Sequence, residues 1–527
     1  MPLTTRAAAI ATSTALACAG LVAVTPAASQ PMPTTTTQAR GCKVSPDAPK
    51  RQLRGEWIAS VVNIDWPSRP GLSVKDQKNE LAAWYDEAAA RGLNAVVVQV
   101  RPTADTFWPS DLEPWSRYLT GDAGVDPGYD PLAFAVREAH ERSLEFHAWV
   151  NPYRVSMNTD REALAADHPV REHPEWAVPY GGKLYYDPGL PQVRRHVEDV
   201  IMEFVDRYDV DAVHFDDYFY PYPVAGQDFP DAGTFAEHGG DFDDVGDWRR
   251  NNTDLLVSEL DERIHAAKPW VKFGVSPFAV WRNAATDPEG SDTTAGAQTY
   301  DNLYADTRRW VREEWVDYIA PQVYWNIGFA PADYAKLIPW WSDTVAGTDV
   351  QLYIGQATYK VGTSTQDPAW FDPAEMSRHL DLNRSYPQVQ GDIYFSANGV
   401  RANRLGHMDI LEAEHYAHPA LIPVTEGVPG RAPDAVTRLE AVPSKRGVRL
   451  SWRGEGASYA VYRVEGRDDK PCVLADARHL LGTVHDGMGA AQTYLDAAVP
   501  SDLQVTYYVT PLDRAYREGE PETVSIR

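Results

Sequence analysis

The chain has 527 residues, of which 43% are apolar, and its 49 Lys and Arg against 75 Asp and Glu give a formal net charge of −26. This length predicts two or three domains with a substantial core. The acidity argues against nucleic acid or an anionic membrane surface as a partner, because both are bound by clustered Lys and Arg.

Residues 1–29 have the layout of a secretory signal peptide. One cation, Arg6, precedes an apolar run of small residues over 7–24, and small residues follow at the expected cleavage site. We therefore expect a secreted or cell-wall-associated protein whose mature chain does not insert into a membrane. Lipoprotein anchoring through Cys18 is the alternative. Residues 30–50 are expected to form a flexible tether.

The cysteines and acidic clusters give no sign of a metal or cofactor. Only Cys42 and Cys472 remain after cleavage, and although export permits a disulfide, their spacing leaves the pairing open. No CxxC pair or zinc-type cluster occurs, and the acidic loop at 241–247 lacks the ligand spacing of a calcium loop. We predict no metal and no cofactor.

From residue 54 to about residue 417, short β-branched runs alternate with amphipathic stretches. The expected strands are 56–62, 94–100, 144–150, 210–216, 271–276, 317–323, 350–355 and 391–396. The expected helices are 76–91, 129–143, 192–208, 247–267, 301–314, 331–344, 373–384 and 403–416. Eight β-then-α units predict an α/β fold of the (β/α)8 TIM-barrel type over residues 51–419.

In four of these strands, the side chains predicted to face the barrel interior turn polar toward the C-terminal end. They include Gln99, Arg101, His147, Asn151, His214, Asp216, Gln322 and Tyr324. TIM-barrel enzymes place their active sites at this end. We expect an active site there, and a polar layer that only bonds within the barrel is the alternative.

Aromatic side chains gather in the long segments that follow three of the strands. Among the 17 Trp, 27 Tyr and 14 Phe, many lie within 101–128, 152–191 and 218–246. Flat rings pack cores, but they also stack on sugars, and composition alone leaves both open. Their position in loops after strands favours the lining of a sugar-binding groove.

The C-terminal part reads as a separate module. Residues 420–433 are rich in Pro and Gly and are expected to be a linker. Residues 434–527 carry short strand patterns separated by turn residues, which predict an immunoglobulin-like β-sandwich resembling a fibronectin type III domain. It contains no catalytic constellation, so we expect a spacer or binding role, and the sequence sets no oligomeric state.

Two adjacent carboxylates, Asp216 and Asp217, end the fourth expected strand. A pair of carboxylates is the minimum equipment for glycoside hydrolysis, because one donates a proton and the other supports charge at the anomeric carbon. Neighbouring residues on a strand point to opposite sides, so a working pair requires the strand to end or twist here. Helix capping or cation binding is the alternative interpretation.

Six ordered sequence blocks resemble the glycosyl-hydrolase-like 10 family. They are RGEWIASVVNIDW at 54–66, NAVVVQVRPTADTFWPS at 94–110, HAWVNPYRV at 147–155, VDAVHFDDYFYPYP at 210–223, FGVSPFAVWRN at 273–283 and VDYIAPQVYW at 316–325. The resemblance covers nearly all of residues 50–420 and implies a (β/α)8 glycoside hydrolase. One branch of the family implies peptidoglycan glycan strands stripped of their stem peptides as substrate.

With an amino-sugar substrate, the 2-acetamido group can act as the nucleophile, so neither Asp needs to attack the anomeric carbon. We hypothesise Asp217 as general acid/base and Asp216 as the orienting carboxylate, with exchanged roles as an alternative. Supporting substrate contacts are expected from Arg101, Asn151, Tyr153, His214, Tyr218, Gln322, Tyr324 and Trp325. Competing hypotheses are a retaining hydrolase of a neutral polysaccharide and a non-catalytic carbohydrate-binding protein of the cell wall.

Overall fold

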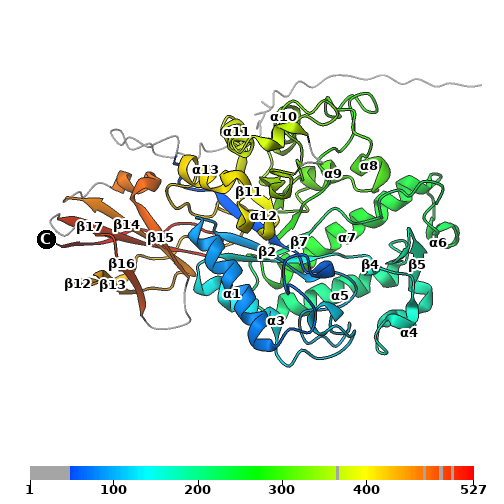
Figure 1. The fold of residues 1–527 in the computed structure, drawn as a ribbon, viewed down its shortest axis with the longest axis horizontal. Coiled ribbons are helices and arrows are strands. Elements are labelled where there is room, and N and C mark those ends of the chain that lie inside the picture. Colours follow the sequence, from blue (N-terminus) through cyan, green and yellow to red (C-terminus); the bar gives the residue numbers. More distant parts are fainter. Residues whose placement is uncertain (1–47, 364–366, 467–470, 486–490, 500–503, 527) are drawn as a thin grey trace, which may run out of the picture. The chain divides into compact units, whose positions relative to one another are not determined.

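A computed structural model of the protein describes residues 48–363, 367–466, 471–485, 491–499 and 504–526 (Figure 1). The predicted signal peptide, Cys18, Cys42 and almost all of the predicted tether lie outside these residues, as does the side chain of Cys472. Within the described part of the chain, no helix combines the length and apolar character needed to cross a membrane.

Eight parallel strands close into a barrel, which confirms the predicted fold. The strands are β1 (Leu53–Ile58), β2 (Ala95–Arg101), β3 (Glu145–Val150), β7 (Ala212–Phe215), β8 (Lys272–Val275), β9 (Tyr318–Ile319), β10 (Gln351–Gln356) and β11 (Val389–Phe395). They follow one another around the barrel in chain order, and β11 pairs with β1 to close it. The C-terminal ends of all eight strands therefore meet at one face.

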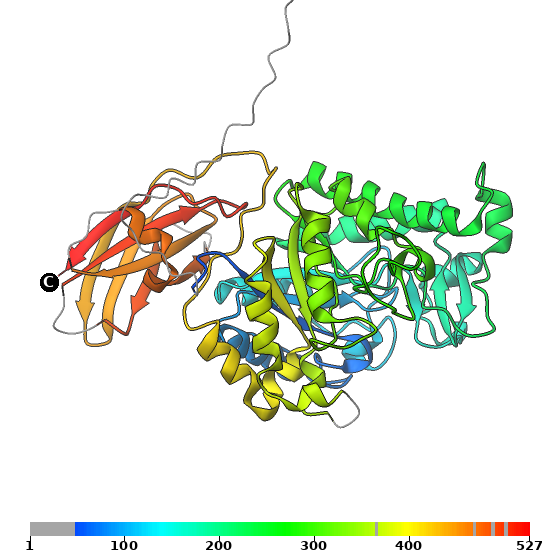
Figure 2. The same cartoon turned by 90° about the horizontal axis from the view of Figure 1, so that it is seen from above.

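Helices cover the outside of the barrel (Figures 1 and 2). The main ones are α1 (Val74–Ala90), α3 (Pro131–Glu141), α5 (Pro191–Arg207), α7 (Val245–Ala267), α9 (Thr307–Arg312), α10 (Tyr334–Val345), α11 (Glu375–Asn383) and α13 (His407–Glu414). Side-chain caps set several starts: Ser73 accepts from the Asp76 amide, and Asp130 accepts from the Ala133 amide with Pro131 in the first turn.

Shorter elements lie in the connections between strands. They are the helices α2 (Arg117–Thr120), α4 (Pro169–Glu172), α6 (Ala232–His238), α8 (Thr299–Asn302) and α12 (Ala397–Ala402), and the strands β4 (Arg154–Ser156), β5 (Ala177–Tyr180) and β6 (Lys183–Tyr186). The last three pair in the order β4-β6-β5. This small sheet and α6 lie together at one end of the barrel in both views (Figures 1 and 2).

Side chains alternate along the strands as predicted. In β2, Val96, Val98 and Val100 belong to the large hydrophobic cluster between strands and helices, whereas Val97 belongs to the cluster inside the barrel. The interior cluster also contains Leu53, Trp57, Ala95, Trp149, Ala212, Tyr318, Tyr353 and Ile393. The barrel interior is therefore a packed core beneath the C-terminal face.

The first strand ends earlier than its sequence predicts. Residues 56–62 were expected to be extended, but β1 stops at Ile58 because side chains take the next backbone donors. The amide of Ala59 donates to Asp65, and those of Ser60 and Val61 donate to the side-chain oxygen of Gln99. The chain turns there, which leaves Val62 at φ 47° with its side chain 56% exposed.

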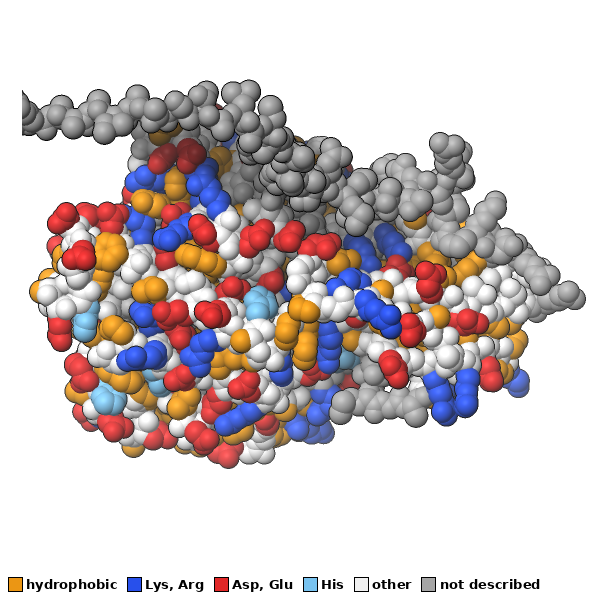
Figure 3. All heavy atoms as spheres, turned by 180° about the vertical axis from the view of Figure 1, so that it is seen from behind, with side chains coloured by type: hydrophobic (Ala, Val, Ile, Leu, Met, Phe, Trp, Pro, Cys, Tyr) orange, Lys and Arg blue, Asp and Glu red, His pale blue; other side chains and the backbone are white. Residues whose placement is uncertain are grey.

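The C-terminal part forms two antiparallel sheets, as predicted. One has the order β12 (Thr437–Ser444), β13 (Gly447–Arg453), β16 (Gln492–Asp496), and the other β15 (Leu480–His485), β14 (Ser458–Glu465), β17 (Val505–Leu512), β18 (Glu522–Ile526). Trp452, Leu450, Tyr459 and Tyr507 share its hydrophobic core. On the face shown in Figure 3, acidic and basic side chains intermingle, so the net negative charge is spread over this surface.

Candidate active site

A cavity of about 320 Å³ opens among the C-terminal ends of the strands. Its polar lining consists of Gln99, Arg154, Asp216, Asp217, Ser276 and Gln322. Its aromatic lining consists of Trp57, Trp149, Tyr218, Tyr324, Tyr359 and Phe395. Carboxyl groups and flat rings in one concave site suit the binding of a polar ring such as a sugar.

Asp216 and Asp217 reach this cavity together because β7 ends at Phe215, one residue before the pair. The strand alternation that would send neighbours to opposite sides no longer applies there. Asp216 is 5% exposed and Asp217 is 7% exposed, so both carboxyl groups lie deep in the site. The strand therefore ends at the Asp pair, as a working pair of adjacent carboxylates requires.

Asp216 is held by a relay of amide side chains. Asn151 Nδ2 lies 2.8 and 2.7 Å from the two carboxyl oxygens of Asp216, and the Tyr218 amide donates to Oδ1 at 3.1 Å. Asn151 Oδ1 accepts from Gln99 Nε2 at 2.6 Å. Because Gln99 Oε1 accepts two backbone N–H groups, neither amide can be reversed, and Asn151 must present N–H donors to Asp216.

Asp217 has a different set of partners. The Tyr222 hydroxyl donates to its Oδ2, and the side chain of Gln322 hydrogen-bonds to it. Burial, followed by repulsion from Asp217, raises the pKa of Asp216 to about 7, and burial also raises the pKa of Asp217. Because the two carboxylates repel each other, the pair retains one proton up to near neutral pH.

Arg154 is the cation of the site. Its Nε and Nη2 donate to the Pro102 carbonyl at 3.1 and 2.9 Å, and its guanidinium lies 5.1 Å from the centre of the Tyr218 ring. It lines the cavity together with the Asp pair. This arrangement fixes a positive charge and an aromatic face beside the carboxyl groups.

The structure brings some of the expected substrate contacts into the cavity and places others behind it. Tyr218, Gln322 and Tyr324 line the cavity beside the Asp pair. Asn151 is fully buried and acts on Asp216 from behind. The remaining expected contacts, Arg101, Tyr153, His214 and Trp325, lie outside the cavity lining.

Each of these outlying residues has another environment. Arg101 is fully buried, pairs with Glu113 at 2.6 Å and donates to the carbonyl oxygens of Asn151 and Pro152. Tyr153 is buried, and Trp325 packs edge-on against Phe278. His214 lies in the barrel interior below the cavity and bonds to Trp57, Ser276 and Tyr318.

Sequence reasoning missed several lining residues, namely Trp57, Trp149, Arg154, Ser276, Tyr359 and Phe395. Strand parity does place Trp149 inward, one step before Asn151, and that pattern was sufficient to find it. Tyr359 and Phe395 come from the last two strands and their loops, and they reach the Asp pair only because the barrel closes. Among the described residues, no group of three or more His, Cys, Asp or Glu side chains is arranged to hold a metal ion.

Replacing Asn151 with Ala is expected to lower kcat for the hydrolysis described below by about 10- to 100-fold. The reason is that Asp216 loses the N–H donor that faces both its oxygens. Initial rates at saturating substrate measure this effect, and a melting curve shows whether the variant is folded. An unchanged kcat in a folded variant would show that Asn151 does not support catalysis through Asp216.

A closed (β/α)8 barrel with adjacent carboxyl groups in an aromatic cavity at the C-terminal face defines a barrel of the glycoside hydrolase type. Comparison with known proteins agrees. The family model "Glycosyl hydrolase-like 10" matches residues 52–372, and the chain belongs to this family and is a glycoside hydrolase.

The relatives are similar over most of the chain. Identity is 49% over 480 residues with Glycosyl hydrolase YngK of Bacillus subtilis (strain 168), covering 89% of this chain and 92% of that protein. It is 41% over 392 residues with Glycosyl hydrolase DigH of Escherichia coli (strain K12), covering 71% and 87%. The solved PgaB (BpsB) glycoside hydrolase domain from Bordetella bronchiseptica aligns at 13% identity with a TM-score of 0.45, covering 69% of this chain and 99% of that domain.

Proposed function

We propose that the enzyme is exported and hydrolyses glycosidic bonds in an amino-sugar polymer, namely peptidoglycan glycan strands freed of their stem peptides. The observation that carries this proposal is the adjacency of Asp216 and Asp217 in one cavity, where they are the only carboxyl groups among the lining residues. A neighbouring pair suits catalysis in which the substrate's own acetamido group is the nucleophile. The secretory layout of residues 1–29 supports export to the cell wall.

The hydrogen bonds support different roles for the two carboxyl groups. Asn151 presents N–H groups to both oxygens of Asp216, so in the complex Asp216 is the acceptor for the substrate's acetamido N–H, and the proton shared by the pair passes to Asp217. Asp217 then keeps the shared proton and gives it to the glycosidic oxygen as that bond breaks. The acetamido oxygen bonds to the anomeric carbon and forms a cyclic intermediate. A water molecule, deprotonated by Asp217, later attacks the anomeric carbon and opens this new ring.

A second cavity of about 220 Å³ supports a substrate longer than one sugar. It is lined by residues 103–105 and 155–158 of the loops after β2 and β3, and by Val62. Val61 and Arg154 line the first cavity while their chain neighbours Val62 and Val155 line the second, so the two cavities lie next to each other. The pair of cavities provides space for consecutive residues of a glycan chain.

The pH profile follows from the shared proton. Because catalysis needs one proton on the Asp pair, kcat/KM is expected to fall as the pH rises through about 7, the pKa to which burial and the neighbouring carboxylate raise Asp216. Rates measured on one defined oligosaccharide between about pH 4 and about pH 9 show this decline of kcat/KM directly. A rate that stays flat through neutral pH would contradict a shared proton.

Product analysis tests the substrate. The full-length protein is incubated with peptide-free peptidoglycan glycan, with chitin oligomers and with neutral glucans, and the products are analysed by mass spectrometry. Release from the peptidoglycan glycan alone is the expected result. Release only from neutral glucans would support a retaining hydrolase of another substrate class, and no release at all would support a non-catalytic carbohydrate-binding role.

A further inference from the structure

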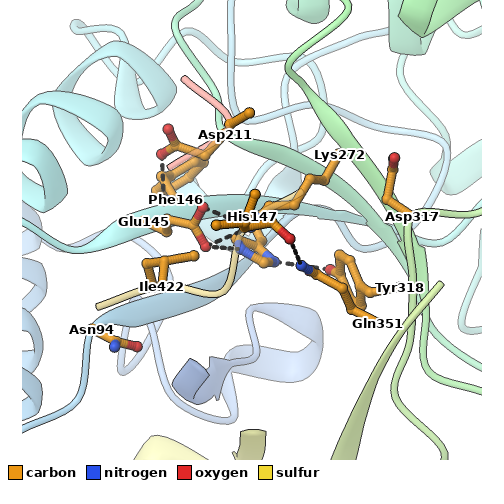
Figure 4. Close-up of polar contacts among 12 residues, drawn as sticks. Asn94, Glu145, Phe146, His147, Asp211, Lys272, Asp317, Tyr318, Gln351 and Ile422 are labelled. Atoms are coloured by element: carbon orange, nitrogen blue, oxygen red, sulfur yellow. Dashed lines mark hydrogen bonds and ion pairs between the residues drawn. The ribbon is translucent and has the colours of Figure 1, made fainter. Parts of the chain in front are cut away.

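A continuous row of hydrogen bonds runs through the barrel interior below the cavity. His214 Nδ1 lies 2.8 Å from the Tyr318 hydroxyl, which in turn lies 2.8 Å from His147 Nδ1. His147 Nε2 lies 3.1 Å from Glu145 Oε2, and the Glu145 carboxylate is bound by Lys272. Figure 4 shows this lower part, where Glu145, His147 and Lys272 lie together beside Tyr318. None of these five side chains is part of the cavity lining.

The upper end of the row fixes the proton on His214. Trp57 Nε1 lies 3.1 Å from His214 Nε2, and an indole N–H can only donate. His214 Nε2 must therefore accept from the indole, and Ser276 Oγ lies 2.9 Å from the same nitrogen. Burial, followed by repulsion from His147, holds the pKa of His214 well below its ordinary value, so the ring is neutral and its single proton is on Nδ1.

The lower end of the row fixes the proton on His147 independently. Lys272 Nζ lies 2.6 and 2.8 Å from the Glu145 oxygens, and although burial opposes ionisation, Lys272 and His147 keep the pKa of Glu145 below its ordinary value. An ionised carboxylate only accepts, so His147 donates from Nε2. Burial also lowers the pKa of His147, and its Nδ1 is then a bare acceptor.

The two ends meet at Tyr318 without conflict. Its hydroxyl accepts from His214 Nδ1 and donates to His147 Nδ1, which uses its one proton and one of its lone pairs. The fold also reserves the space for this ring: a Cβ at Gly274 on β8 would lie 2.0 Å from the Tyr318 ring. From Trp57 to His147, every donor therefore points the same way, from the cavity floor toward Glu145, which also accepts from Lys272.

We propose that Tyr318 and His147 are positioning residues that lock His214 in its Nδ1–H tautomer and thereby fix Trp57 and Ser276 in the floor of the catalytic cavity. With the other tautomer, an N–H of His214 would face the Trp57 N–H, and the indole would have to move. Trp57 and Ser276 line the same cavity as Asp216, so their placement shapes the substrate site.

The tautomers are measured without using activity. Two-bond proton–nitrogen correlation spectra of the full-length protein with 15N-labelled histidine report the protonated nitrogen of each ring. Two neutral histidines of opposite tautomer, unchanged between about pH 5.5 and about pH 7.5, are expected among the 14 histidines of the chain. They are assigned as the rings whose signals change in Tyr318→Phe. A charged ring, or equal tautomers, would overturn the proposal.

The effect on catalysis is measured with a matched pair of variants. This second experiment rests on the proposed function. Tyr318→Phe removes the hydroxyl that both histidines use, and kcat/KM for glycan release is expected to fall about 10-fold in a folded protein. Tyr353→Phe is the control, because Tyr353 is an equally buried interior tyrosine whose hydroxyl bonds to Gln351 instead. Its kcat/KM is expected to stay within about 2-fold of wild type.

The outcomes separate the two proposals. Equal kcat/KM values for folded Tyr318→Phe and Tyr353→Phe would overturn the positioning role even if the tautomers are as expected. If the wild-type protein releases no glycan product, the proposed function fails. In that case the position of Trp57 is followed by the indole proton resonance, which should shift in Tyr318→Phe and not in Tyr353→Phe. An indole resonance that does not move in Tyr318→Phe would overturn the inference.

Discussion

Replacing Asp217 with Asn is expected to lower kcat for glycan hydrolysis by about 10³- to 10⁴-fold, while KM changes little. Asn keeps the shape of the side chain and its contacts with Tyr222 and Gln322, but it cannot deliver a proton to the glycosidic oxygen. The effect is the largest we expect on activity, because proton donation is needed only as the bond breaks. Single-turnover rates on peptide-free glycan measure it.

Two comparisons make this result specific. Asp228→Asn changes an exposed carboxylate further along the loop after β7 and should leave kcat unchanged. Asp216→Asn should also be slow, but a substrate with a good leaving group should partly restore the rate of Asp217→Asn and not that of Asp216→Asn. Full activity in Asp217→Asn would contradict the acid role, and the reverse pattern of rescue would exchange the two roles.

The largest effect on stability is expected from Glu113→Gln, which leaves the Arg101 guanidinium buried without its counter-charge. Both side chains are 0% exposed and are joined by Nη2–Oε1 and Nε–Oε2 contacts of 2.6 and 2.7 Å. Breaking such a buried pair costs about 3–5 kcal/mol of unfolding free energy. Urea unfolding near neutral pH measures this cost, and Glu162→Gln, at an exposed ion pair with Arg171, is the control and should change little.

The same pair gives a pH signature of stability. Burial opposes ionisation, but Arg101 and His196 lower the pKa of Glu113 to about 2, from an ordinary value of 4.5. A lowered native pKa stabilises the fold above the ordinary value, and this contribution is lost as the pH falls from about 4.5 to about 2. The wild type should lose about 3 kcal/mol over that range through Glu113, and Glu113→Gln should lack this part of the decline. Parallel curves for the two proteins would contradict the assignment.

Arg101 shows what the alternation of side chains along a strand cannot predict. Strand parity placed it inside the barrel, but the pairing register shifts between Gln99 and Arg101, so Arg101 lies opposite Val150, which packs on the helix side of the sheet. The interpretation as a substrate contact also depended on an open environment. Glu113 comes from the loop after β2 and seals the guanidinium, which then holds the carbonyl oxygens of Asn151 and Pro152. The sequence gives no signal for this pairing, since Glu113 is one of many acidic residues in the aromatic-rich segments.

His214 shows the same limit over a longer distance. Its position on β7, two residues before Asp216, suggested that it contacts the substrate. In the structure it bonds instead to Tyr318, which is 104 residues further along the chain, to Trp57 on β1 and to Ser276, which directly follows β8. None of these partners could be read from the neighbourhood of His214, because all three lie far away in the sequence and come together only in the closed barrel.

What the sequence determined by itself is the local part of this protein. The eight strand–helix units, the inward and outward alternation and the end of β7 at the Asp pair all arise from patterns within about 15 residues, and such patterns are set by local backbone geometry and burial. Tertiary structure alone decided which side chains share the cavity and which are sealed beneath it. The reason is that the distance between strands 100 residues apart depends on barrel closure, and closure decides whether an inward polar group meets solvent, substrate or a buried partner.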